Sequence, residues 1–443
     1  MLRSFQDIFK IPELKRRLLF TLAIIIAYRI GASIPTPGVN AQALMNFFAN
    51  QKGTLFGFLD MFSGGALGRF SVFALGIMPY INASIIMSLL QTVLPYLERL
   101  SKEGEVGRKK ITQYTRYGTV FLALIQSMGL IFLVKGLEAE QGIKVVLNPG
   151  LSFQLMTMLT LTTGTIVIMW LGEQITEFGV GNGISIIIFS GIVVRLPAVI
   201  GQTAQLFKTG DISLFKILFL MALVVGIVAL VVFVEQGQRR VPVQYAKRIV
   251  GRRMYGGQST YLPLRVDQSG VIAVIFAVSL MMFPRTVANF LPKGSFLQAI
   301  VNWMQPGTPL YTILYGGLIV FFCYFYTAVT FNPNDLAENM KKFGGFVPGI
   351  RPGAPTADYI DKILTRITLV GALFIVCIAI IPDFIFGGLG LGFWGNIFSG
   401  TAILIVVGVA LDTMGQIESH LLMRHYDGFM GKGKLKGRYF NIK

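Results

Sequence analysis

The sequence predicts an all-α polytopic membrane protein with ten transmembrane helices. Hydrophobic residues make up 53% of the 443 positions, and charged residues make up only 14%. Apolar runs with at most one charged residue recur along the whole chain, and about 20 such residues suffice for a helix to cross about 30 Å of hydrocarbon. No soluble core needs so many runs of this length. The runs lie at 18–34, 70–94, 117–135, 152–171, 184–200, 213–234, 270–291, 309–330, 364–382 and 397–415.

Lysine and arginine concentrate in alternate connections between these spans, and this bias predicts the orientation. If the N-terminus is cytoplasmic, the segments on its side carry 29 of the 39 lysines and arginines. Because cytoplasmic loops accumulate these residues, we expect both termini to be cytoplasmic. The same bias explains most of the net charge of +18 without a nucleic-acid partner. The first run follows LKRR as a secretory signal would, but no clear cleavage site comes after it, so we expect a retained span.

Ten spans divide into two sets of five. We expect an N-terminal half over 1–200, an external hinge over 201–213, a C-terminal half over 214–415 and a cytoplasmic tail over 416–443. An odd number of spans in each half makes the second half enter the membrane from the opposite side. Inverted halves of this kind usually enclose a path near their interface.

The stretch 57–68, GFLDMFSGGALG, is apolar in composition but cannot cross a bilayer alone. It contains Asp60 and several glycines, Arg69 follows it, and a full span comes directly after it. Irregular backbone at membrane depth is tolerated only where protein covers it or a water-filled cavity adjoins it. The stretch therefore indicates either a cavity with a segment folded into it or a re-entrant loop without a special role.

Two long cytoplasmic connections, 235–268 and 331–363, are rich in arginine. The first mixes basic pairs with the β-formers Val241, Val243 and Tyr245, which predicts a protruding β-hairpin-like arm. We expect these arms either to serve topology alone or to dock a large, partly acidic partner. The connection at 98–116 is predicted to be a charged, solvated loop, and GVGNGIS at 179–185 is predicted to be a turn between spans.

The predicted spans are almost bare of the ionisable side chains that ion-coupled transporters need. Asp412 and Arg29 lie only near span ends. The chain has no Walker-type nucleotide motif. Cys323 and Cys377 lie in apolar runs and both histidines lie in the C-terminal tail, so we expect no enzyme activity, no metal and no cofactor. The lack of these ionisable groups favours a passive channel over a solute transporter. A structural scaffold, the third alternative, would predict neither a segment folded into a channel nor a polar cavity.

Long motifs identify a family resemblance that covers essentially the whole chain. The chain closely resembles the SecY family, the central channel subunit of the bacterial Sec protein translocase. The motifs are MFSGGALGRFSVFALGIMPYINASII (61–86), KEGEVGRKKITQYTRYGT (102–119), MWLGEQITEFGVGNGISIIIF (169–189), AKRIVGRRMYGGQSTYLPL (246–264), FVPGIRPG (346–353) and GTAILIVVGVALDTM (400–414).

The resemblance implies an hourglass-shaped pore between the two inverted halves. A ring of apolar side chains would form its constriction, and hydrophobic constrictions seal by excluding water. The ring maps to Ile77, Ile81, Ile184, Ile188, Ile275 and Ile405. The broken stretch would be the plug, with the residues Phe58, Leu59, Asp60, Met61, Phe62, Ser63, Gly64, Gly65, Ala66 and Leu67.

The resemblance also implies a lateral gate between spans 2 and 3 and spans 7 and 8, with Asn82 and Phe283 on its facing surfaces. Arg252, Arg253 and Arg351 map to arms that dock the SecA motor ATPase or the ribosome, including its RNA. SecE and SecG subunits, secretory and membrane protein precursors and anionic lipids are the other expected partners. The expected location is the bacterial cytoplasmic (inner) membrane.

Overall fold

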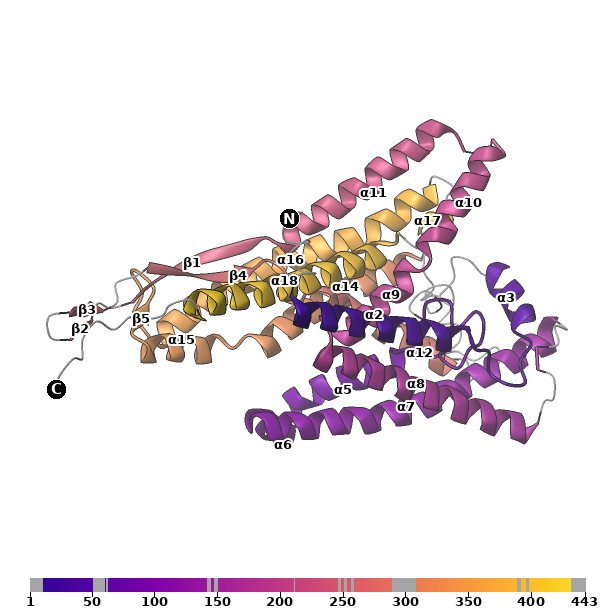
Figure 1. Ribbon diagram of the computed structural model, residues 1–443, viewed down its shortest axis with the longest axis horizontal. Helices are drawn as coiled ribbons and strands as arrows, with labels where there is room; N and C mark the ends of the chain where they lie inside the picture. Colours follow the sequence, from indigo (N-terminus) through magenta and orange to yellow (C-terminus); the bar gives the residue numbers. More distant parts are fainter. Residues whose placement is uncertain are drawn as a thin grey trace, which may run out of the picture.

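The computed structural model describes residues 11–50, 60, 63–141, 145–146, 150–210, 212–245, 248–250, 253–255, 259–288, 308–388, 392–395 and 398–431. A helix coincides with each of the ten predicted spans, and most of the long helices lie side by side (Figure 1). In the order of the spans, these helices are α2 (Pro12–Ser33), α5 (Met78–Val93), α7 (Glu105–Gln141), α8 (Leu151–Phe178), α9 (Gly183–Val193) with α10 (Leu196–Lys208), α11 (Leu214–Glu235), α12 (Val271–Ala288), α14 (Pro309–Thr330), α16 (Ala354–Gly388) and α18 (Gly400–Gly431).

Seven of the described helices are long and apolar enough to cross a membrane, and an eighth span results if a bent pair counts as one. The bent pair is α5 with the short helix α6 (Pro95–Lys102), which meet at 99°. The chain is therefore a multi-pass membrane protein. The remaining short helices are α3 (Ala41–Asn50), α15 (Pro333–Lys342) and α17 (Gly392–Gly395).

Two sequence-based boundaries are wrong. Span 2 was predicted to start at residue 70, but α5 starts at Met78, with Pro79 in its first turn, where the missing N–H of proline costs nothing. The connection 98–116 was predicted to be a loop, but it is helical apart from a turn at Gly104, whose φ is +77°. An exposed Lys102–Glu98 ion pair at 2.7 Å supports α6, since residues four apart lie on one helix face.

Span 5 is broken into two helices. α9 ends at Val193 and α10 begins at Leu196, so Val194 and Arg195 lie at the break. Asn182 caps α9, because its side-chain oxygen accepts from the N–H groups of Ile184 and Ser185, and the predicted turn at 179–185 is confirmed up to this point. Residues 201–208 of the predicted hinge belong to α10, which leaves a short connection before α11.

The predicted β-hairpin arm is confirmed. β1 (Gln238–Tyr245) pairs antiparallel with β4 (Ser259–Arg265), and β2 (Arg248–Val250) pairs with β3 (Arg253–Tyr255) nearer the tip. The arm extends beyond the helix ends (Figure 1). A short strand from the other long connection, β5 (Gly345–Phe346), adds to the free edge of β1. Val241 and Val243 are buried against α15 and the start of α16.

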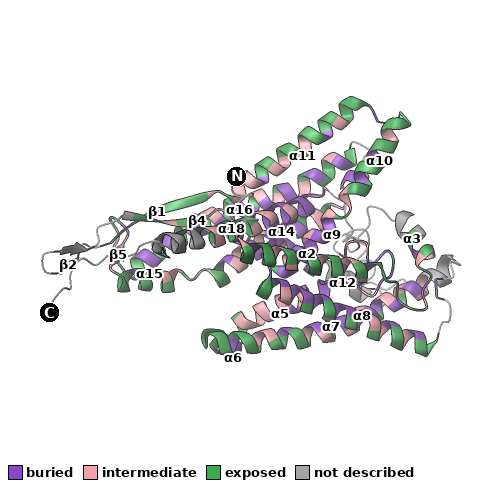
Figure 2. Ribbon diagram, in the orientation of Figure 1, coloured by how far each residue is buried: buried purple, intermediate pink, exposed green. Residues whose placement is uncertain are grey.

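The largest apolar core lies where α5, α9, α12 and α18 meet, and α11 stands apart as an exposed helix (Figure 2). Only 11% of the apolar window of α11 is buried, although it has the highest mean hydropathy of the candidate spans. Such a surface is unfavourable in water and suited to hydrocarbon. The apolar exposure of α11 therefore agrees with a membrane environment.

Candidate functional site

The residues after the broken stretch fold as a chain of turns that we call the anchored segment, defined as Asp60 and residues 63–77. Its backbone needs left-handed conformations at Gly64 (φ +65°) and Gly65 (φ +88°), which glycine adopts without a Cβ clash. Phe70 has φ +46° and is the one non-glycine residue with positive φ among the described positions. The segment is nevertheless well covered, because Ser63, Ala66, Leu67 and Phe70 are all buried.

Helix α2 holds the beginning of this segment through two side chains. The Tyr28 hydroxyl donates to the Ser63 carbonyl at 3.0 Å, and its ring stacks on Phe73 with centroids 5.8 Å apart. Arg29 Nη1 donates to the Gly64 carbonyl at 3.2 Å, and Arg29 Nη2 donates to the Ser190 carbonyl of α9. Arg29 thus connects α2, the anchored segment and α9.

The Asp60 carboxylate makes contacts in two directions. Its Oδ1 accepts from the Gly68 N–H at 2.7 Å, which joins the two ends of the predicted plug region. Its Oδ2 forms an ion pair with Arg195 Nη2 at the break between α9 and α10. Farther along, residues 70–72 pair with the connection after α2, where the Thr36 N–H donates to the Phe70 carbonyl at 2.8 Å.

The six predicted ring isoleucines belong to one apolar cluster. Ile77 caps the start of α5 and the others come from α5, α9, α12 and α18. Five of the six belong to the largest apolar core and Ile184 packs against it, and this core also draws on α2, α8, α14 and α16. Five of them are at most 7% exposed, and Ile184 is half-buried. α12 packs against α5 and α18, α18 packs against α9, and α8 links α9 to α5, so the helices form a closed circuit.

An open cavity of about 720 Å³ adjoins Ile184 and Tyr80. Its wall carries an ion pair between α7 and α8, in which Arg116 Nε and Nη2 donate to the two oxygens of Glu173 at 2.9 and 2.8 Å. Trp170 and Glu177 also line it. An open cavity with charged side chains on its wall therefore reaches the edge of the isoleucine cluster.

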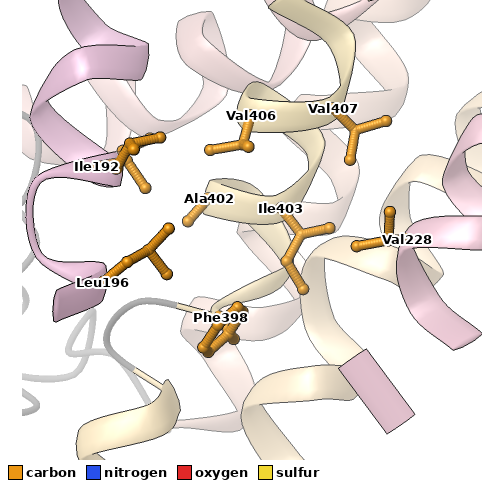
Figure 3. Close-up of a pocket in the computed structure, with 9 residues that line it drawn as sticks. Ile192, Leu196, Val228, Phe398, Ala402, Ile403, Val406 and Val407 are labelled. Atoms are coloured by element: carbon orange, nitrogen blue, oxygen red, sulfur yellow. The ribbon is translucent and has the colours of Figure 1, made fainter. Parts of the chain in front are cut away.

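A second, smaller cavity lies next to the break in span 5. It has a volume of about 70 Å³, and only apolar side chains line it. Ile192 and Leu196 contribute one wall, and Val228 of α11 lies on the other side (Figure 3). Residues of α18 and the Phe398 before it complete the lining (Figure 3). The chain on either side of Arg195 thus borders an unfilled space.

The predicted lateral-gate helices are in contact. α12 packs against α5 and α7, and Asn82 is half-buried on α5. Phe283 lies within α12, but its side chain is outside the described residues. The gate helices therefore meet, and the structure describes one of the two predicted facing side chains.

The other predicted residues are placed as follows. Arg351 is exposed in the turn before α16, and its carbonyl accepts from the Thr356 hydroxyl at 2.8 Å. Arg253 lies in β3, though its side chain is outside the described residues. Phe58, Leu59, Met61, Phe62 and Arg252 also lie outside the described residues.

Sequence reasoning missed Tyr28 and Arg195, and it noted Arg29 only as a residue near a span end. A usable signal was available, since intramembrane charges usually pair with one another or with backbone carbonyls. Asp60, Arg29 and Arg195 are three such charges in otherwise apolar surroundings.

Comparisons with known proteins agree with this architecture. The family model for SecY matches residues 71–414. The chain is 51% identical over 428 residues to the protein translocase subunit SecY of Escherichia coli K12, which covers 96% of each chain. A solved structure concerned with the SecY plug domain, described as stabilising the closed translocation channel and maintaining a membrane seal, has a TM-score of 0.65 at 17% identity, with 97% of this chain and 99% of that chain covered.

Canine Sec61, solved in a ribosome-channel complex, has a TM-score of 0.63 at 16% identity, with the same coverage of 97% and 99%. These two structural likenesses support the fold, while the sequence match extends over nearly the whole chain. The chain belongs to the SecY family.

Proposed function

We propose that this chain is the central channel subunit of a protein translocase. It passes unfolded secretory polypeptides across the bacterial cytoplasmic membrane and releases hydrophobic segments sideways into lipid. The observation that carries the proposal is the burial of five of the six isoleucines in one apolar core to which α5, α9, α12 and α18 contribute, with the open cavity at Ile184 and the anchored segment at Ile77.

The isoleucine cluster suits a pore that accepts chains of every composition. Branched apolar side chains exclude water from a constriction and offer a passing peptide no hydrogen-bonding partner. Ile81 and Ile188 are nearly fully buried, which supports a constriction that side-chain packing can close. Opening it requires the surrounding helices to separate rather than a specific ligand to leave.

Residues 57–68 are the plug in this proposal, and Asp60 and residues 63–68 of the anchored segment are its described part. Its contacts to α2 and to the span 5 break are mostly hydrogen bonds and one ion pair. The relative whose plug domain maintains a membrane seal supports this role. Two inverted halves, 1–200 and 214–415, would frame the pore, with the hinge between them.

The lateral gate is proposed to lie where α12 meets α5 and α7, with Asn82 and Phe283 on its surfaces. Separation of these helices opens a side path to hydrocarbon. An apolar segment then partitions into lipid with a gain of about 0.3–0.6 kcal/mol for each central Leu, Ile, Phe or Val. A hydrophobic segment is thereby distinguished from a secreted one by its free energy of transfer.

The energy source is proposed to be a partner, either the SecA motor ATPase or the translating ribosome. The arm built from β1 to β4 lies at one end of the molecule (Figure 1). Arg351 is exposed in the connection between β5 and α16. We assign this end to the cytoplasm, together with both termini. Arginine suits this role because its planar guanidinium pairs bidentately with phosphate or carboxylate. Arg252, Arg253 and Arg351 are the proposed contacts, and the ribosome complex of the canine relative supports ribosome docking. SecE and SecG are the proposed companion subunits, and anionic lipids the proposed lipid contacts.

The test is reconstitution of this chain with its companion subunits and motor in vesicles, followed by translocation of a stalled secretory precursor. A photo-crosslinking residue replaces Ile81 or Ile188 in the channel. We expect adducts with the precursor at both positions. The matched control replaces Leu218 of α11, a helix outside the proposed gate, where the side chain is 60% exposed, and gives no adduct. Adducts at Leu218 alone would place the polypeptide outside the proposed pore.

Motor docking is tested by reversing the charge of Arg351. Arg351→Glu is expected to lower motor-driven export at least about tenfold, since repulsion replaces a charge-assisted hydrogen bond. Assembly with the companion subunits should be unchanged, because the side chain is exposed. Lys208→Glu, an exposed reversal at the end of α10 far from the arm, is the control and should export normally (Figure 1). Normal export by Arg351→Glu removes this residue from the docking site.

A further inference from the structure

The ion pair between Asp60 and Arg195 differs from the other ion pairs of the described chain. Its two side chains are 17% and 22% exposed, while every other such pair has at least one side chain that is 48% exposed or more. Charges withdrawn from water need a close partner, because their solvation is lost. This pair is thus the one described ion pair whose separation leaves two partly buried charges.

The pair connects segments that are 135 residues apart in the chain. Asp60 is the first described residue of the anchored segment, and its second oxygen holds the Gly68 N–H. One carboxylate therefore closes the loop between residues 60 and 68 and ties that loop to span 5. Loss of the carboxylate would release both connections at once.

A second cation reinforces the attachment. Arg29 donates to the Gly64 carbonyl and to the Ser190 carbonyl, so it also joins the anchored segment to α9. The described contacts of these two guanidinium groups are with the carbonyl oxygens, the Ser190 hydroxyl, the Tyr28 ring and Asp60. Asp60 is the one negative charge among these contacts.

The position of Arg195 makes its contact sensitive to a change in span 5. It lies at the turn between α9 and α10, where its N–H donates to the Ile192 carbonyl at 3.2 Å in place of an i−4 bond. Ile192 and Leu196, on either side of the turn, line the apolar cavity of about 70 Å³ (Figure 3). A change in the angle between α9 and α10 would therefore move the Arg195 side chain relative to Asp60.

Resting on the proposed function, we propose that Asp60 and Arg195 form a latch that holds the plug in its seat until the break between α9 and α10 changes its angle. Bending at the break withdraws the guanidinium from the carboxylate. The Gly68 contact and the loop 60–68 then lose their attachment to span 5 together. The latch couples the position of the plug to the geometry of one span.

The test measures ion efflux through the idle, fully assembled complex in vesicles. Asp60→Asn and Arg195→Gln each abolish the ion pair, and each is expected to raise the idle leak about tenfold, in line with the cost of separating a partly buried pair. The double variant should leak no more than either single variant, because both remove the same interaction. Additive effects, or leaks equal to that of the unaltered complex, overturn the latch.

Glu98→Gln is the matched control, since it removes the exposed Lys102 pair on α6 and should leave the leak unchanged. A second measurement does not depend on the leak. Asp60→Cys and Arg195→Cys are combined with Cys323→Ser and Cys377→Ser and joined by a reducible thiol crosslinker that spans the space of the two lost side chains. The joined complex should lose precursor transport and regain it on release. Normal transport while joined also overturns the proposal.

Failure of the latch can be told apart from failure of the proposed function. The unaltered complex is assayed for precursor transport in the same vesicles. If the unaltered complex transports precursor and the latch variants leak no more than it does, the latch alone is rejected. A complex that transports no precursor rejects the channel function itself.

Discussion

The anchored segment and the isoleucine cluster adjoin each other at Ile77, but they are held by different kinds of interaction. The beginning of the segment, at Asp60, Ser63 and Gly64, is held by directional contacts from Tyr28, Arg29 and Arg195, each of which is lost over a short displacement. The later residues of the segment pack in apolar cores. The cluster is held by apolar contacts from four helices, which have no preferred direction. Directional contacts suit a segment that is either seated or released, and apolar contacts suit a constriction that widens around a passing chain.

The largest expected effect comes from shortening two side chains in the cluster. Ile81→Ala combined with Ile188→Ala removes buried apolar volume, and each change is expected to destabilise the packing by about 2–5 kcal/mol. The idle complex should leak small ions, measured as halide efflux from vesicles. Ile81→Leu with Ile188→Leu keeps the volume and should leak little. An unchanged leak in the alanine variant would show that the anchored segment seals alone.

The next effect tests the seat of the anchored segment through its two glycines. An added Cβ at Gly64 would lie 2.6 Å from Arg29 Nη1 and 3.0 Å from the Gly191 Cα, whereas at Gly65 it would meet nothing within 4 Å. Gly64→Ala and Gly65→Ala both introduce left-handed strain of about 1–2 kcal/mol. Gly64→Ala should lower the thermal unfolding midpoint further and raise the leak more than its neighbour. Equal effects would mean that the contact with Arg29 is unimportant.

A smaller effect is expected from removing a single hydroxyl. Tyr28→Phe keeps the ring stacked on Phe73 and deletes the hydrogen bond to the Ser63 carbonyl. The free energy of unfolding should fall by about 0.5–1.5 kcal/mol, and the leak should rise a few-fold. Thermal unfolding and halide efflux measure the two quantities. A loss of stability without a change in leak would separate the seating of the segment from the seal.

The smallest expected effect concerns a directional polar contact far from the seal. Asp267 precedes α12 and its Oδ1 accepts from the Gly270 N–H at 2.7 Å and the Ser269 hydroxyl at 2.9 Å. Burial raises the pKa of Asp267 above its ordinary value. The folded state therefore disfavours the ionised carboxylate. The contribution of Asp267 to the free energy of unfolding falls as the pH rises above the pKa that this carboxyl has in the unfolded chain.

Asp267→Asn keeps an oxygen acceptor and removes the charge. We expect a higher unfolding midpoint than the unaltered protein at pH 8, a smaller gain at pH 5, and no change in ion leak. A gain in the unfolding midpoint that is larger at pH 5 than at pH 8 would contradict a raised pKa of Asp267. A change in leak would extend the role of polar contacts beyond the anchored segment.

The number and order of helices could be predicted from sequence because apolar length is a local property of the chain. The residues at which helices begin and end were harder to predict. α7 begins at Glu105 and α16 at Ala354, well before the apolar runs inside them, since charged residues continue a helix readily once it leaves hydrocarbon. Residues 70–77 are as apolar as a span but form turns, and composition cannot distinguish the two.

The candidate site was predictable only in part. The family resemblance located the isoleucines, and the structure gathers them in one cluster. The attachment of the anchored segment depends on pairs such as Asp60 with Arg195 and Tyr28 with Ser63, which are distant in sequence and follow no spacing rule. Such pairs are set by tertiary packing. The unusual presence of charges beside apolar spans was the signal that pointed to them.

Strand β5 has a mechanical consequence for the cytoplasmic arm. Phe346 and Gly345 pair with Gln244 and Tyr245, so backbone hydrogen bonds join the two long connections into one sheet. β1 follows directly from α11, β4 leads into α12, and β5 leads into α16. A load applied to the tip of the arm is therefore shared among three membrane helices. One of the three is α12, so a push at the arm would reach a helix that packs against α5 and α7.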